Sequence, residues 1–250
     1  MPTHESDAIV LRQYSLSESD RIVVFITREH GKVRAVARGV KKPKSRLAGR
    51  LEPLNHIHLE FYIREGHDLA QVRQTEIIHS YLGKNPSLQQ IYAYTYFAEL
   101  INEIIEEFSP NYPLYRLLLA SLNAAERLGI SQSLIRYFEI WCLKLNGLLP
   151  NYVYCSNCGK CVKDEGFYAR LESGKVRCEA CSYGRGLHIR AVSAVALQMI
   201  IKLSPEKFVS RVFSGAVDVD LERLTQGLLL LNLGKHLKSY GAMKEVLRDR

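Results

Sequence analysis

The sequence predicts an α+β protein of several domains, in which a small β barrel precedes helices that carry a cysteine-rich insert. Three observations support this prediction. Apolar and polar residues alternate along short stretches of the first 80 positions, apolar residues recur every three or four positions from residue 87 onward, and five of the six cysteines lie within 27 positions. The chain has 250 residues, and its 47% hydrophobic and 24% charged content is typical of a folded globular protein.

Five strands are expected in the N-terminal region, each bounded by turn-forming residues. In the third strand Val33, Ala35 and Ala37 share one face, and charged residues lie on the other. Five strands in so short a region are typical of a small barrel. The expected strands are residues 8–14, 21–27, 32–38, 57–63 and 69–78, with a turn at 65–68 between the last two.

The connection after the third strand is strongly basic. Residues 32–50 hold eight Lys or Arg and no acid, and the rest of the chain has 26 basic and 26 acidic residues, so this segment accounts for the whole net charge of +8. Cations at this density repel one another, and the repulsion is tolerated most easily where an anion binds. A solvated basic loop without a partner is the alternative. The residues predicted to contact phosphates are Lys32, Arg34, Arg38, Lys41, Lys42, Lys44, Arg46 and Arg50.

An oligonucleotide-binding (OB) barrel has five strands, and its longest connection lies after the third strand, where the basic segment falls. The sequence therefore predicts an OB-fold nucleic-acid-binding domain over residues 1–80, although SH3-like barrels have similar strand numbers. Such barrels stack bases on aromatic rings. The candidate rings are Tyr14, Phe25, Phe61 and Tyr62, although a core position is favoured for each of them.

Helical periodicity begins where Ser87 and Gln90 form a capping box. Pro and Gly residues divide the region that follows into separate helices. We expect one helical domain, made of residues 81–151 and 188–250. Its helices are predicted at 87–108, about 113–128, 131–147, 191–203, from 204 onward, and from Asp218 or Asp220 to about 240.

Four cysteines form two Cys-x-x-Cys pairs, Cys155 with Cys158 and Cys178 with Cys181, separated by nineteen residues. Two such pairs supply four thiolates to one tetrahedral Zn²⁺, and this closed shell supports structure rather than catalysis. The sequence therefore predicts a zinc module at residues 152–187 with one structural ion; a redox pair or disulfides are the alternative. Cys161 could compete as a ligand, but a glycine suited to the tight turn follows the first pair and favours Cys155.

Other functional signatures were sought and not found. The sequence has no phosphate-binding loop, dinucleotide fingerprint, His-Glu-x-x-His motif or nucleophile elbow, so we do not expect an enzyme or a small-molecule substrate. His56 and His58 lie two apart in a strand without an evident third ligand, which favours a solvated strand face over a metal site. No apolar run approaches the ~20 residues that span a bilayer, and the N-terminus is polar, so a cytoplasmic location without membrane contact is expected.

Several motifs resemble the bacterial RecO DNA repair proteins. They are residues 8–11, 18–22, 37–46 and 51–54, together with the two cysteine pairs, and the resemblance covers nearly the whole chain. It implies an OB domain, a helical domain and an inserted zinc module. It also implies a mediator of homologous recombination in the RecFOR pathway, nucleoid-associated, that binds single- and double-stranded DNA and anneals complementary strands. With RecR, such a protein helps to load RecA onto DNA coated by the single-stranded DNA-binding protein SSB.

Two alternatives come from other functional classes. One is a structural RNA-binding or ribosome-associated zinc-ribbon protein with a basic arm. A binding competition between single-stranded DNA and structured RNA would distinguish it from a DNA-binding protein. The other is a zinc-dependent nucleic-acid enzyme. That enzyme would need an open coordination position on the metal, which four thiolates do not leave.

Overall fold

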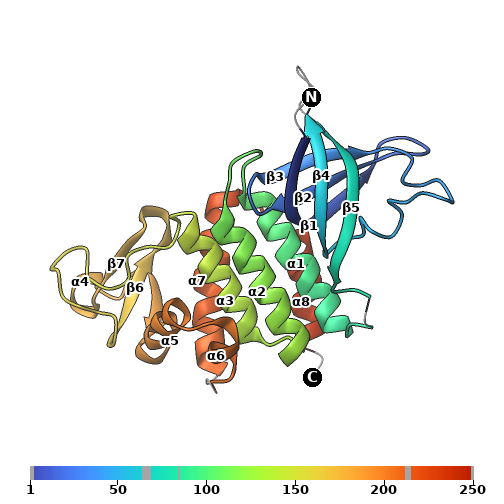
Figure 1. The fold of residues 1–250 in the computed structure, drawn as a ribbon. Coiled ribbons are helices and arrows are strands. Elements are labelled where there is room, and N and C mark those ends of the chain that lie inside the picture. The colour runs from blue at the N-terminus through green and yellow to red at the C-terminus, as the bar shows by residue number, and fades with distance from the viewer. Residues whose placement is uncertain (1–2, 64–68, 84, 212–214, 249–250) are drawn as a thin grey trace. The chain divides into compact units, whose positions relative to one another are not determined.

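The computed structural model describes residues 3–63, 69–83, 85–211 and 215–248, with the side chain of residue 216 left out. The chain is α+β: five strands are followed by helices, and a second, smaller sheet lies further along (Figure 1). It divides into two compact units, Met1–Glu126 with Ser239–Arg250, and Arg127–Lys238. In the ranges given above, no helix is both long enough and apolar enough to cross a membrane.

The five N-terminal strands form a closed barrel with the order β1-β2-β3-β5-β4. All neighbours pair antiparallel except β3 and β5, which pair parallel. The five predicted strands are confirmed, while the turn predicted at 65–68 lies outside the described residues. The strands are β1 (Thr3–Ser15), β2 (Arg21–Thr27), β3 (Gly31–Ala37), β4 (Asn55–Ile63) and β5 (Ala70–Ser80).

Apolar and polar residues alternate along the strands, so the apolar side chains fill the interior of the barrel. Val33, Ala35 and Ala37 point into its core, as predicted, together with residues from the other strands. Phe25 and Phe61 also lie there with at most 1% of their surface exposed, so these two rings belong to the core, as the sequence favoured, and are not available to stack on bases. β1 starts five residues earlier than predicted because its polar first residues pair with β4, a long-range contact that alternation does not reveal.

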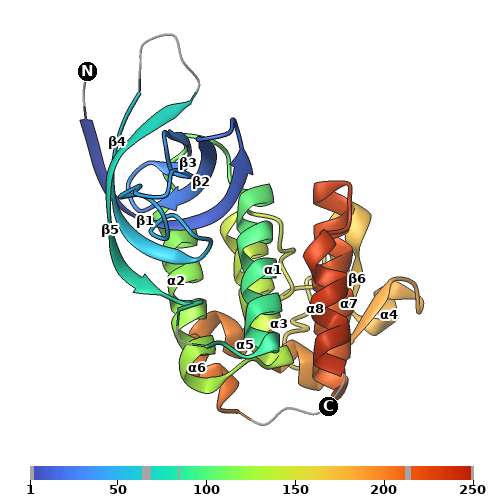
Figure 2. The same ribbon diagram turned by 90° about the vertical axis from the view of Figure 1, so that its right-hand side faces the viewer.

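The first unit also contains α1 (Leu88–Ile104), most of α2 (Tyr112–Leu128) and, from Ser239, α8 (Lys238–Arg248). The capping box of Ser87 and Gln90 is present as predicted. α1 contacts β1 and β2, and one end of it meets the barrel (Figure 2). The helix ends before 108 because the chain turns to extended backbone at Ile105, and the Phe108 N–H donates to the Lys32 carbonyl at 2.9 Å.

The second unit contains α3 (Gln132–Leu145), α5 (Ala191–Lys202), α6 (Pro205–Val209) and α7 (Gly215–Leu233). A buried ion pair joins Arg136 and Glu139 at 2.8 Å on α3, and Glu139 accepts hydrogen bonds from Thr225 and Gln226 on α7. The single last helix predicted up to residue 240 is wrong. Gly234 has a φ of +67° and closes α7, so that α8 forms separately.

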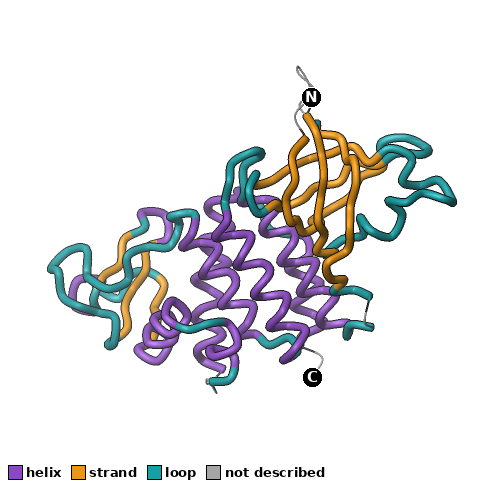
Figure 3. The backbone as a smooth tube through the Cα atoms, in the orientation of Figure 1, coloured by secondary structure: helices purple, strands orange, loops and turns teal. Residues whose placement is uncertain are grey.

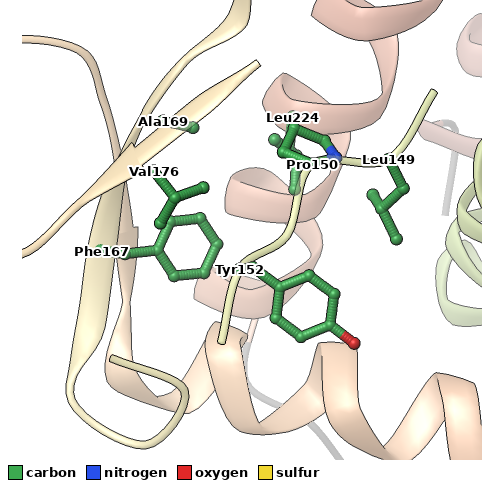
Figure 4. A pocket seen from close by; sticks show the side chains of 7 residues that line it. All are labelled: Leu149, Pro150, Tyr152, Phe167, Ala169, Val176 and Leu224. Carbon is green, nitrogen blue, oxygen red and sulfur yellow. The ribbon is translucent and has the colours of Figure 1, made fainter. Parts of the chain in front are cut away.

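The cysteine-rich insert folds around a three-stranded sheet in the order β7-β6-β8. Two strands form a hairpin, β6 (Gly166–Arg170) and β7 (Lys175–Arg177), joined by the 3-10 turn η1 (Leu171–Ser173). On the other side of β6 lies β8 (Leu187–Arg190), which was not predicted. One face of the sheet is apolar. Its side chains border a small apolar pocket with the chain entering the insert and α7 (Figure 4), lined by Leu149, Pro150, Tyr152, Phe167, Ala169, Val176 and Leu224.

Gly31 provides a test of how closely the segment after α1 packs on the barrel. It has a φ of +69°, and a Cβ there would lie 1.9 Å from the Ser109 carbonyl oxygen. We expect Gly31→Ala to lower the thermal unfolding temperature well beyond Gly49→Ala. Gly49 has a φ of +74° but no heavy atom within 4 Å of its would-be Cβ, so that variant carries only the backbone strain of about 1–2 kcal/mol. Equal shifts in unfolding temperature would contradict the close packing.

Candidate nucleic-acid interface and metal centre

The basic segment continues from β3 into a folded loop, residues 38–54, that projects from the strands (Figure 3). Backbone hydrogen bonds of 3.0 to 3.3 Å that span three residues form successive turns between residues 39 and 50. Val40 and Leu51 are buried in the barrel core, with 6% and 1% of their surface exposed. The loop is therefore held by apolar anchors near both ends.

Asp20, in the turn between β1 and β2, fixes the first part of the loop. Its Oδ1 accepts a hydrogen bond of 2.7 Å from the Gly39 N–H. That bond, together with one from Ser19, lowers the pKa of Asp20, so the carboxylate stays charged. Lys41 extends the attachment, because its Nζ lies 2.6 Å from the Ser15 hydroxyl and 2.5 Å from the Ser17 carbonyl.

The structure divides the eight predicted cations into two groups. Five are exposed, and four of these make no side-chain hydrogen bond or ion pair with any residue that the structure describes, Lys41 being the fifth. They lie within residues 38–46, a stretch that contains no acid, so they concentrate positive charge at the surface. The exposed five are Arg38, Lys41, Lys42, Lys44 and Arg46.

The other three, Lys32, Arg34 and Arg50, are half-buried and already have partners. Lys32 donates to the Asn102 carbonyl at 2.9 Å, and Arg34 lies 3.1 Å from the Glu107 carboxylate. Burial lowers the pKa of Lys32, although nearby acids oppose the shift. Arg50 donates to the Thr75 carbonyl on β5 at 2.6 Å, which ties the end of the loop to the barrel.

A hollow of about 410 Å³ opens on the outer face of the barrel beside Lys32 and Arg34. Tyr14, 40% exposed, forms part of its wall, and the Arg12 guanidinium lies 4.8 Å from the centre of that ring. Aromatic, aliphatic and cationic groups thus meet in one open site. Its lining residues are Tyr14, Ile22, Val24, Lys32, Arg34, Asn102 and Glu107.

The four predicted metal ligands lie together. The sulfurs of Cys155, Cys158, Cys178 and Cys181 are all within 4.8 Å of one another. The first pair makes a tight turn in which Gly159, with a φ of +73°, donates from its N–H to the Cys155 carbonyl at 2.9 Å; the second lies at α4 (Glu179–Ser182).

The remaining cysteines stand outside this cluster. Cys161 is exposed and is not one of the four grouped sulfurs, so the structure places Cys155 in the cluster in preference to it. Cys142 is fully buried on α3, as expected of a core residue.

The donor set suits a soft divalent cation. Although burial opposes it, backbone N–H groups lower the pKa of the Cys155 thiol to about 6. Despite the Lys160 N–H, which favours the thiolate, the neighbouring sulfurs raise the pKa of Cys158 to about 11. Four sulfurs this close cannot all be anionic unless a cation lies among them. The cluster could therefore hold a metal ion of the kind that thiolates prefer.

Some site features were missed or misread in the sequence. His56 is half-buried, with its Nε2 2.8 Å from the Tyr115 hydroxyl, and burial lowers its pKa, so the expectation of a solvated strand face is wrong for it. Asp20 and Glu107 were not singled out as site residues. Asp20 does lie in one of the motifs that carry the family resemblance, but its contact with Gly39 spans 19 positions and leaves no local signal.

Comparisons with known proteins agree over the length of the chain. Residues 1–81 match the family model described as recombination protein O N terminal, and residues 86–241 match recombination protein O C terminal. Proteins named DNA repair protein RecO are similar: one from Bifidobacterium adolescentis is 36% identical over 82% of this chain and 81% of its own length. One from Myxococcus xanthus is 29% identical over 100% of both chains, and one from Koribacter versatilis is 29% identical over 93% and 95%.

The cysteine cluster predicts the effect of removing single thiols. Cys155→Ser should abolish stoichiometric metal binding and lower the unfolding temperature, because the metal neutralises crowded thiolates that otherwise repel one another. Cys161→Ser is the matched control and should change neither quantity. Metal analysis by mass spectrometry and thermal unfolding measure both effects. Equal loss of metal in the two variants would contradict the ligand set.

Proposed function

The chain belongs to the RecO family of DNA repair proteins, and from this premise we propose that it is a recombination mediator that binds single- and double-stranded DNA and anneals complementary strands. The observation that carries the proposal is the anchored loop, in which five exposed cations lie within residues 38–46 with no acid among them. Annealing is opposed by repulsion between phosphates. A fixed basic surface that binds both strands removes this barrier without bond-making chemistry, so we propose that the protein is not an enzyme.

We assign the N-terminal barrel to the OB fold. Its strands β4-β1-β2-β3 lie in the order of a Greek key, and β5 closes the ring between β3 and β4. The long connection after β3 is the basic loop, as the OB fold would place it. The domain limits expected from the sequence, residues 1–80, 81–151 with 188–250, and 152–187, stay part of this proposal.

In this proposal the exposed cations carry the first phosphate contacts. Arg38, Lys42, Lys44 and Arg46 need only release counterions, whereas Lys41 must also give up its contacts with Ser15 and Ser17, so binding should depend strongly on salt. Lys32, Arg34 and Arg50 would contact phosphates only after the exposed cations have bound, because they must first release their present partners. Arg34 can exchange Glu107 for a phosphate at small cost, since an exposed ion pair is worth about 0.2–1 kcal/mol. The Tyr14 ring beside them is the candidate for stacking an unpaired base.

We propose that the four clustered cysteines hold one structural Zn²⁺. A full set of thiolate ligands leaves no position for water, so the ion would stabilise the insert without activating a nucleophile. The residues of the chain shape the site: the Gly159 turn and the start of α4 bring the two cysteine pairs together.

Family membership further supports the proposal that the protein acts in the RecFOR pathway. We propose RecR and SSB as its protein partners, with loading of RecA onto SSB-coated single strands as the outcome, and the nucleoid as its place of action in the cytoplasm. These partners rest on the family alone.

Charge reversal of the loop tests the proposed function. Lys42→Glu, Lys44→Glu and Arg46→Glu together should lower the slope of log affinity against log salt by about 2 to 3, since each lost phosphate contact removes roughly 0.7–0.9. The triple variant should also fail to anneal complementary oligonucleotides. Fluorescence anisotropy and a strand-annealing assay provide the measurements.

The control for this experiment reverses three exposed cations of the second unit, Lys202, Lys207 and Arg211, and so has the same net charge. It should retain most DNA affinity. Equal effects of the two triple variants, or tighter binding of structured RNA than of single-stranded DNA by the unmodified protein, would overturn the proposal in favour of general electrostatics or an RNA-binding role.

A further inference from the structure

The three-stranded sheet of the cysteine-rich insert has a second face that the proposed function does not use. Side chains alternate between faces, and the register sets them in rows. Tyr168 on the central strand β6 is opposite Arg177 on β7 and His188 on β8. Arg170 is opposite Lys175 in the neighbouring row. These five side chains therefore share one face of the sheet.

This second face is the more exposed of the two. The apolar face is buried, with Phe167, Val176 and Ile189 at most 2% exposed. On the second face Lys175 and His188 are exposed and the other three are half-buried. α4 contacts β6 and β7, and Arg177 donates to the Cys181 carbonyl there at 3.4 Å, so the second cysteine pair holds this side chain.

Aromatic rings form the centre of the face. The rings of Tyr168 and His188 stack, with centroids 4.6 Å apart and planes inclined by 18°. In a stacked pair each ring covers one face of the other, and an unpaired base of any sequence can extend the stack on an outer face.

The charge around these rings is positive. Arg170, Lys175 and Arg177 form no ion pair with the residues that the structure describes, and the five side chains of the face include no acid. Arg190, which ends β8 on the same side, differs from them because the Asp220 carboxylate binds it at 2.7 Å. The face thus combines three cations with a stacked ring pair, the pattern that single-strand binding surfaces share.

We propose that this face binds single-stranded DNA, with a base on the Tyr168–His188 pair and phosphates on Arg170, Lys175 and Arg177. The inference rests on the proposed DNA-binding function and adds a contact surface in the second unit, separate from the basic loop. A duplex keeps its bases stacked and paired, so it can use the cations but not the rings. The face therefore favours single strands.

The test uses the full-length, zinc-loaded protein and oligo(dT) and duplex probes in titrated salt. Tyr168→Leu should weaken oligo(dT) binding about 5-fold or more and leave duplex binding and the salt slope unchanged, because stacking on aromatic rings is lost but no charge is. His188→Ala, at an exposed position, should act in the same direction. If metal content and circular dichroism show that Tyr168→Leu does not fold, His188→Ala alone tests the inference.

The charge arm compares Lys175→Glu with Lys207→Glu, an equal charge change at an exposed position on α6. Lys175→Glu should lower the single-strand salt slope by roughly 0.7, whereas Lys207→Glu should not change it. Equal slopes for these two variants, or unchanged oligo(dT) affinity in Tyr168→Leu and His188→Ala, would overturn the inference. So would equal losses on oligo(dT) and duplex in the ring variants.

The loop variant of the preceding subsection separates the two proposals. If it loses DNA binding while the sheet variants bind normally, the inference about the sheet fails and the proposed function stands. If the loop variant binds DNA as the unmodified protein does, the proposed function itself is wrong.

Discussion

Mutual repulsion among the cations of residues 32–50 is the constraint on which the N-terminal unit depends. Two unit charges 4 Å apart repel by about 1 kcal/mol in water and by more near a protein surface. A flexible loop would relax this repulsion by spreading out. Here burial of Val40 and Leu51, at about 1.5–3 kcal/mol for each side chain, offsets it and keeps the cations in fixed positions.

The same constraint explains why the basic segment is not uniform. The β3 backbone is part of the barrel, so Lys32 and Arg34 cannot move apart. Instead, Lys32 bonds to the Asn102 carbonyl in α1, and Arg34 pairs with Glu107 just after that helix. In the loop there is no such compensation, and the side chains extend into solvent. The cations on β3 are therefore paired within the protein, whereas those of the loop remain available to an external anion.

Sequence patterns predicted those features that depend on neighbours in the chain. The alternation in β3, the capping box at Ser87 and the two cysteine pairs are local, and the structure contains all three. The end of α1 was misjudged because it depends on pairing of residues 107 and 108 with Lys32 on β3. β8 was missed because only its partner β6 makes it a strand.

The same distinction between local patterns and long-range contacts applies to the site residues. Charge density identified the basic segment, but it could not distinguish exposed cations from those with partners, since Asn102, Glu107 and Thr75 are remote in sequence. The binding role of the eight cations stays a prediction, because the position of a residue in the sequence does not determine which groups its side chain contacts.

The cysteine cluster is linked to the charged face of the neighbouring sheet, so a metal held by the cluster would influence a surface that it does not touch. Arg177 lies directly before Cys178, and its guanidinium donates to the Cys181 carbonyl. A metal that joins the two cysteine pairs would therefore fix both the end of β7 and the α4 carbonyl that orients this cation. β7 is only three residues long, so this link would add to its pairing with β6 and to the burial of Val176. A metal bound by the four cysteines would thus help to order the positively charged face, although none of the four lies on that face.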